Sequence, residues 1–298
     1  MPMVDTHIHL FDPNRPQGAP HTGPANYFTA TQGAFPATYR QVMAQHDIVG
    51  VIKVEASPWF EDNLWALQVA DSDDIMVAFV GNFRIEAPDF PQALERHARH
   101  PLLRGVRYGN LWRYDIAARS REPGFLARLQ LVADADLVLE GSNPQLDLVE
   151  AMLRVNDAVP TLRIIIDHLP RYNPTPQEER PYAAALREIA QRPNLFVKLS
   201  ANLNPANRSP RMRDHRERLD LLYETFGADR VLFASGWPNV EADGSVHTGV
   251  AIVQDYFARK PIEAREKFFW RNSLRVYKWR PRTERQHALV AEAQAAAH

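Results

Sequence analysis

Two histidines near the start of the chain are the residues whose type and spacing point most directly to chemistry. His7 and His9 lie in the apolar segment VDTHIHLF, which begins at residue 4. Side chains alternate between faces along a β-strand, so both imidazoles should point the same way. Two imidazoles on one face can ligate a divalent metal or polarise a carbonyl group. The pair therefore predicts either a metal centre or a site for a carbonyl substrate.

Further polar residues end other apolar segments of the chain. They are Glu55, Arg107, Glu140, His168, Lys198 and Ser235, the last followed by Gly236. Burying several ionisable groups without partners is costly, so chance does not readily place them all at such positions. In a barrel of parallel strands, the strand ends meet at one face and build the active site. We therefore expect these side chains to converge in the pocket of an enzyme.

The two carboxylates in this set have competing interpretations. Glu140 is either a metal ligand or water-activating base, or the partner of Arg107 or Lys198 in an ion pair. Glu55 is either a base or a ligand of a substrate hydroxyl, or it pairs with a basic neighbour. Asp167 has the opposite strand parity to His168, so we expect it to face the helices in a structural role.

Substrate binding is assigned to side chains near the same strand ends. The planar guanidinium of Arg107 suits a substrate carboxylate. Tyr108 would add an apolar wall beside it, and Lys198 either binds substrate or forms an internal ion pair. The predicted substrate-binding residues are Glu55, Trp59, Arg107, Tyr108 and Lys198.

The elements that position these residues recur along the whole chain. Eight strand-like segments begin near residues 4, 49, 76, 103, 135, 162, 195 and 231. Most of the intervals fit one strand, one helix and two short loops, which predicts a (β/α)8 TIM barrel. An open doubly wound sheet is the alternative, but the number of strands and the lack of GxGxxG after the first strand favour the barrel.

Two segments depart from this rhythm. Residues 12–36 are rich in Pro and Gly and form a long loop after the first strand, either a lid or a surface excursion. Residues 281–298 are expected to form a helical tail after a single barrel domain over residues 1–280. The aromatic segment 267–270 either packs on the barrel or forms a subunit interface, which leaves a homo-oligomer open.

Composition excludes several classes of function. The 298 residues include 35 basic and 36 acidic side chains, and the net charge of −1 argues against nucleic acid or an anionic membrane as partner. No apolar run approaches the ~18 residues of a membrane span. The N-terminus does not resemble a signal peptide, so we expect a cytoplasmic protein. With no cysteine, the chain has no thiolate nucleophile and no Cys-ligated metal.

Three segments resemble the amidohydrolase superfamily, in particular its amidohydrolase-related branch of lactonases and decarboxylases. They are VDTHIHLFDP at residues 4–13, IDHLP at 166–170 and the segment Ser235–Pro238. The resemblance extends from His7 to about Tyr277 and implies a TIM barrel that hydrolyses a small organic substrate. It places His7, His9 and His168 in the active centre, where some members bind one zinc or manganese ion. The lactone-hydrolysing members that this chain resembles often work without metal.

One position departs from the family pattern. The family reads Ser-Asp-Trp-Pro where this chain has Ser235-Gly236-Trp237-Pro238. In the family that aspartate binds metal and activates water, and glycine does neither. A change of chemistry, a loss of activity and an engineered substitution are the alternatives. Because glycine leaves space here, Gly236→Asp is expected to fold.

These observations lead to one main functional expectation and two alternatives. The main one is a lactonase-like hydrolase of a small lactone or similar cyclic ester whose substrate carries a carboxylate or hydroxyls. His7, His9 and His168 would stabilise the oxyanion, and Glu140 or Glu55 would take a proton from water. The alternatives are a non-oxidative decarboxylase, and a catalytically impaired barrel that binds a small molecule. Zinc or manganese is expected to be held weakly or not at all.

Overall fold

Eight strands form a single sheet whose neighbours are all parallel. The computed structural model describes residues 1–18, 33–204, 206–242 and 244–296. The strands follow the order of the chain from β1 to β8. Their bounds are β1 Met3–Ile8, β2 Ile48–Val54, β3 Met76–Asn82, β4 Leu103–Arg107, β5 Val138–Gly141, β6 Arg163–Ile166, β7 Leu195–Lys198 and β8 Val231–Leu232.

The segment after β8 closes the sheet against β1. Backbone hydrogen bonds run from Thr6 N to Phe233 O at 3.1 Å, from Gly236 N to His7 O at 2.9 Å and from His9 N to Trp237 O at 2.8 Å. The predicted (β/α)8 barrel is therefore confirmed. These bonds also bring the histidine pair and Gly236, which lie far apart in the sequence, side by side.

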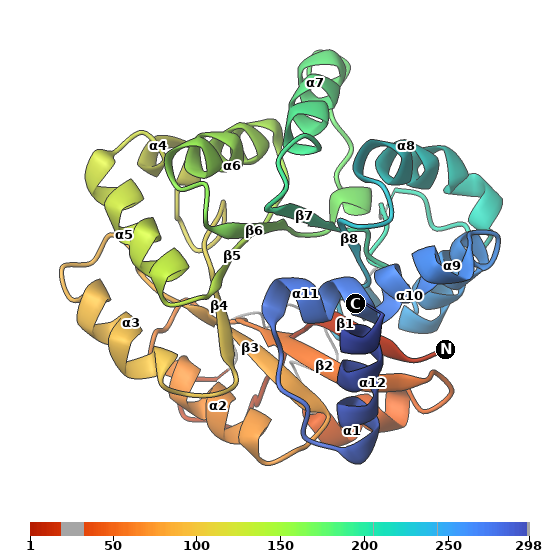
Figure 1. The fold of residues 1–298 in the computed structure, drawn as a ribbon, viewed down its shortest axis with the longest axis horizontal. Helices are drawn as coiled ribbons and strands as arrows, with labels where there is room; N and C mark the ends of the chain where they lie inside the picture. The colour runs from red at the N-terminus through yellow and green to blue at the C-terminus, as the bar shows by residue number, and fades with distance from the viewer. Residues whose placement is uncertain (19–32, 205, 243, 297–298) are drawn as a thin grey trace.

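Helices surround the barrel (Figure 1). Their bounds are α1 Pro36–Val42, α2 Asp62–Asp71, α3 Phe90–Ala98, α4 Ile116–Arg119, α5 Pro123–Asp134, α6 Leu146–Ala158, α7 Glu179–Ile189, α8 Arg216–Phe226, α9 Val246–Ala258, α10 Ile262–Glu266, α11 Asn272–Tyr277 and α12 Glu284–Ala295. α3 shows why they dock: Phe90, Leu94 and His97 recur at helical spacing and are buried on one face. No helix among the described residues is long and apolar enough to cross a lipid bilayer.

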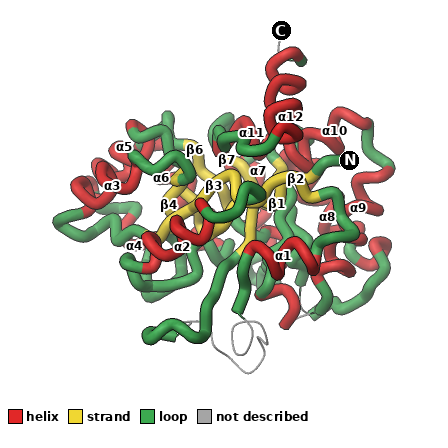
Figure 2. Tube along the Cα trace, turned by 90° about the horizontal axis from the view of Figure 1, so that it is seen from below, coloured by secondary structure: helices red, strands yellow, loops and turns green. Residues whose placement is uncertain are grey.

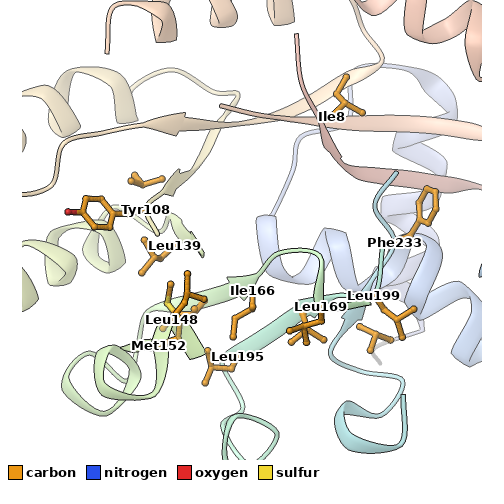
Figure 3. Close-up of a cluster of buried hydrophobic side chains, with 14 of the residues drawn as sticks. Ile8, Tyr108, Leu139, Leu148, Met152, Ile166, Leu169, Leu195, Leu199 and Phe233 are labelled. Carbon is orange, nitrogen blue, oxygen red and sulfur yellow. The ribbon is translucent and has the colours of Figure 1, made fainter. Parts of the chain in front are cut away.

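The apolar core has two parts. The first lies between the strands and the surrounding helices, where Leu139 and Ile166 pack with Leu148 and Met152 of α6 (Figure 3). The second joins strand residues such as Ile165 to side chains of the C-terminal segment. Strands covered on both faces explain the continuous apolar runs in the sequence.

The C-terminal segment packs on the barrel through its aromatic residues. The aromatic segment Lys267–Arg271 forms a π-helical turn whose Phe268 stacks on Phe257 with ring centroids 3.8 Å apart. Its aromatic side chains are buried within the chain, so they pack on the barrel as one alternative predicted. α12 projects from one end of the molecule (Figure 2).

Of the predicted long loop after β1, residues 19–32 lie outside the described residues.

Candidate active site

Three imidazoles meet at the ends of β1 and β6. The Nε2 atom of His7 lies 3.2 Å from Nε2 of His9 and 3.3 Å from Nε2 of His168. His7 is completely buried beneath the other two rings, whereas His9 and His168 line a cavity. The expectation from strand alternation that His7 and His9 point the same way is consistent with this geometry.

A contact at Nδ1 orients each of the two imidazole rings that line the cavity. Nδ1 of His9 lies 3.2 Å from the carbonyl oxygen of Val54. Because a carbonyl can only accept, this nitrogen carries the ring proton and Nε2 carries the lone pair. Nδ1 of His168 lies 3.1 Å from Oγ of Ser200, which donates its own hydrogen to the carbonyl oxygen of Asn202 at 3.4 Å and can therefore accept from this ring. These contacts turn both Nε2 atoms towards His7.

Burial keeps two of the imidazoles neutral. The pKa of His7 lies well below its usual value because the ring is desolvated and faces the Lys198 ammonium. Burial also lowers the pKa of His168 to about 3. Desolvation disfavours the charged form of a histidine, so both rings are uncharged near neutral pH.

A buried lysine contacts His7 and two carboxylates. The Nζ atom of Lys198 lies 2.8 Å from Oε2 of Glu140, 2.9 Å from Oδ1 of Asp167 and 3.0 Å from Nδ1 of His7. The other oxygen of Glu140 accepts a hydrogen bond from the hydroxyl of Tyr277 on α11. Both carboxylate oxygens of Glu140 are thus engaged inside the barrel. Of the alternatives for Glu140 and Lys198, the structure shows the internal ion pair.

Arg107 forms a second buried network. Its guanidinium lies 3.1 Å from Oδ2 of Asp167 and 3.2 Å from Oε1 of Glu55. The indole nitrogen of Trp112 donates to the other oxygen of Glu55 at 3.0 Å. Glu55 therefore pairs with a basic neighbour, which was one of its two alternatives. Arg107 itself still lines the cavity.

The expected position of Asp167 is wrong. The strand-parity argument placed it against the helices, but it is fully buried between Lys198 and Arg107. The reason is that β6 ends at Ile166, and His168 adopts a left-handed backbone with φ of 52°. Side-chain alternation does not continue through such a turn.

The cavity above the imidazoles has a volume of about 410 Å³. Of the predicted residues, it is lined by His9, Arg107, His168 and Gly236. Its other polar lining comes from loops, and residues that sequence reasoning missed include Asn143, Arg171, Asn202 and Asn239. The available signal was their position a few residues after strand ends, at the face where the catalytic groups meet.

Several predicted site residues lie elsewhere. The described residues that line this cavity do not include Glu55, Trp59, Tyr108, Glu140 or Lys198. The side chain of Trp59 is 38% exposed, and Tyr108 is buried and stacked on Tyr114 at 4.5 Å. We therefore revise the roles of Trp59 and Tyr108 as substrate contacts and of Glu140 as a base, because these groups do not face the cavity.

Comparison with known proteins follows from this geometry. Residues 4–279 match the family model described as "Amidohydrolase". The chain belongs to the amidohydrolase family. It is 26% identical over 243 residues to an L-fucono-1,5-lactonase of Burkholderia ambifaria, an alignment that covers 79% of this chain and 80% of the relative. A protein of the same name from Burkholderia multivorans is 25% identical over 281 residues, covering 90% and 92%.

A solved structure shows the same fold. An amidohydrolase from Burkholderia multivorans, described with bound zinc, superposes with a TM-score of 0.79 at 22% identity. The superposition covers 94% of the present chain and all of the Burkholderia multivorans chain. This agreement extends the barrel assignment to nearly the full chain.

Gly236 has less space around its Cβ position than we expected from the sequence. Its backbone has φ of 76°, and a Cβ atom placed there would lie 3.1 Å from Cβ of Asn202. A side chain at this position would meet both backbone strain and a close neighbour. An aspartate at this position would therefore require Asn202 to shift by a few tenths of an ångström, a cost that the expectation of free space did not include.

A tightly held divalent metal fits this donor set only in part. Tetrahedral ligands at a zinc–nitrogen distance of ~2.0–2.1 Å lie about 3.3 Å apart, which matches the imidazole spacing. However, Nζ of Lys198 lies 3.0 Å from Nδ1 of His7, and because an ammonium can only donate, a hydrogen bond here places the ring proton on the nitrogen that would have to bind metal. Gly236 supplies no fourth ligand. A second group of His7, Glu140 and Asp167 has donor atoms within 4.8 Å of one another, but the Lys198 ammonium already contacts all three. The residues therefore do not fit a resident metal in this protonation state.

Proposed function

We propose that this amidohydrolase hydrolyses a lactone of a sugar acid. The observation that carries the proposal is the convergence of two imidazoles, His9 and His168, beside Arg107 in a cavity whose remaining polar lining is rich in amides. Two relatives named L-fucono-1,5-lactonase support the substrate class. Amide side chains such as Asn143 and Asn239 suit the hydroxyl groups of a sugar lactone.

Water activation is assigned to His9. Its Nδ1 proton is held by the carbonyl of Val54, so its Nε2 lone pair can accept a proton from water. His168 is a weak base because burial lowers its pKa to about 3. The hydroxide that forms attacks the lactone carbonyl carbon as His9 takes the proton. This replaces Glu140 and Glu55, whose oxygens are engaged in ion pairs.

Arg107 is assigned to the carbonyl oxygen. Glu55 and Asp167 hold its guanidinium at the cavity wall, where it can stabilise the tetrahedral oxyanion. When the intermediate collapses, the ring C–O bond breaks and the His9 imidazolium returns its proton to the leaving oxygen. The product is the open-chain hydroxy acid, and His9 is neutral again. His7, which is fully buried, acts through the other two rings.

Acid release from a lactone panel tests this proposal. The panel contains L-fucono-1,5-lactone, other sugar 1,5-lactones and δ-valerolactone, which lacks hydroxyls, with the spontaneous rate subtracted. We expect turnover of sugar lactones in preference to δ-valerolactone, and a fall in kcat of ~10²–10⁴ in His9→Asn. No turnover of any lactone, or an unchanged rate in His9→Asn, would overturn it. A parallel measurement of carbon dioxide release tests the decarboxylase alternative, which no contact among the described residues favours.

A further inference from the structure

We propose that Lys198 fixes the proton of the His7 ring on Nε2, and that this contact makes the histidine triad a proton-transfer site with weak metal affinity. Lys198 is a positioning residue in this proposal, because it touches His7 and does not reach the cavity. The part concerning the ring proton and metal affinity is independent of the proposed function. The part concerning catalysis rests on it.

The contacts of Lys198 surround its ammonium group with one imidazole and two carboxylates. An ammonium has three N–H donors and no acceptor. It donates to Oε2 of Glu140 at 2.8 Å and contacts Nδ1 of His7 at 3.0 Å, while Oδ1 of Asp167 lies 2.9 Å away as an ion-pair partner. The side chain is completely buried, and the carboxylates of Glu140 and Asp167 flank it. The Tyr277 hydroxyl bonded to Glu140 holds this arrangement from the C-terminal segment.

The position of the His7 proton follows from this inventory. Since Lys198 can only donate, Nδ1 of His7 must accept, and the single proton of the neutral ring lies on Nε2. The competing arrangement would have Nδ1 donate to Oδ1 of Asp167, but that distance is 3.5 Å, longer than a good hydrogen bond. The closer contact with Lys198 decides between the two forms.

This proton has consequences for the two neighbouring rings. His7 Nε2 faces the Nε2 atoms of His9 and His168 at 3.2 and 3.3 Å. Both of those rings have their other nitrogen against an oxygen, Val54 O for His9 and Ser200 Oγ for His168. One buried N–H therefore faces two acceptors, and because it can align with only one of them at a time, the Nε2 lone pair of His9 can take a proton from water while the His7 proton is directed at His168. A metal ligand needs a lone pair on this same atom of His7, so metal binding must first move the proton against the Lys198 contact.

Nitrogen NMR on the wild-type protein tests the proton position directly. Protein labelled with ¹⁵N at histidine is compared with His7→Asn to assign the His7 signals. We expect the pattern of a neutral ring protonated at Nε2 across the range where the protein is active. A ring protonated at Nδ1 would overturn the proposal, and this outcome needs no folded variant of Lys198.

A charge-balanced double variant tests the consequence for metal. Lys198→Met with Glu140→Gln removes one positive and one negative charge, while Asp167 keeps its partner Arg107. His7 Nδ1 should then protonate and turn to Asp167, which exposes the Nε2 lone pair. We expect zinc affinity, measured by calorimetry with zinc alone, to rise by ~10–100-fold, the usual size of such supporting contacts.

A surface pair provides the matched control. Lys267 contacts Glu263 at 2.7 Å and Asp229 at 2.9 Å, so Lys267→Met with Glu263→Gln makes the same chemical change away from the site. This control should keep wild-type zinc affinity and His7 signals. Unchanged zinc affinity in a folded Lys198→Met, Glu140→Gln variant would contradict the proposal. Failure of the lactone assay alone would leave the NMR and zinc results standing and would count only against the proposed reaction.

Discussion

At the scale of single residues, Gly236 shows how a missing side chain shapes its surroundings. Its backbone lies in the left-handed region, and Asn202, which is 7% exposed, packs where a Cβ would stand. Asn202 in turn accepts a hydrogen bond from Arg171 at 2.9 Å. The glycine therefore supports a cavity wall made of loop residues, and a carboxylate introduced there would displace that wall.

Gly236→Ala should destabilise the protein. Left-handed backbone at a residue with a side chain costs ~1–3 kcal/mol, and the 3.1 Å contact with Asn202 adds to it. Urea unfolding followed by circular dichroism measures the loss. Gly124→Ala is the control, because its Cβ would meet nothing within 4 Å and it lies in α5. A Gly236→Ala variant as stable as Gly124→Ala would show that the position is not strained.

At the scale of elements, strands were predictable and the turns after them were not. Apolar runs that end in a polar residue marked the strand ends, and so His7, His9, Arg107 and His168 were placed correctly at one face. Asp167 was misplaced because strand alternation stops at Ile166, and no residue-by-residue periodicity marks that point.

Loop residues of the cavity were harder still. Arg171 and Asn202 line the cavity from the segments that follow β6 and β7, and the path of those segments depends on backbone angles that a sequence pattern does not contain. The pairing of Lys198 with Glu140 was among the alternatives for both residues, since strand ends in one barrel must meet. Its contact with His7 required the side-chain geometry.

The docking of α12 is an element-scale feature with a clear test. The side chain of Gln286 is 1% exposed and donates to the carbonyls of Val49 at 2.8 Å and Asp74 at 3.0 Å. Gln286 also completes a capping box with Thr283. Its removal leaves the carbonyl of the buried Val49 without this donor, which costs ~1–3 kcal/mol.

We therefore expect Gln286→Ala to lower the melting temperature and leave kcat/KM of the folded enzyme unchanged. Gln294→Ala in the same helix, where the side chain is exposed, should change neither quantity. Differential scanning calorimetry and the lactone assay measure the two effects. An equal melting temperature for the two variants would show that α12 contributes little to the barrel.

At the scale of the whole molecule, the barrel buries ionisable groups whose protonation is coupled to folding. His7 and His168 have pKa values lowered by burial, whereas burial raises the pKa of Glu140 to about 7. A histidine with a lowered pKa is neutral when folded but takes up a proton when unfolded, below about pH 6.5. Its contribution to stability is therefore full above that pH and is lost on acidification. Glu140 acts in the opposite direction, because it binds its proton more readily in the folded state.

His168→Asn isolates one of these opposing effects. Between about pH 6 and pH 4 the unfolded chain protonates His168 and the folded chain does not, so this one ring should contribute a slope of up to about 1.4 kcal/mol per pH unit to the free energy of unfolding. Comparing the variant with the wild type cancels the contribution of Glu140 and of other carboxyl groups. Urea unfolding at several pH values should therefore show a shallower loss of stability on acidification in His168→Asn. His287→Asn, which changes an exposed histidine of α12, should keep the wild-type slope. If all three proteins lose stability in parallel, the His168 ring must already be protonated in the folded barrel. The neutral triad on which the proposed reaction depends would then have to be abandoned.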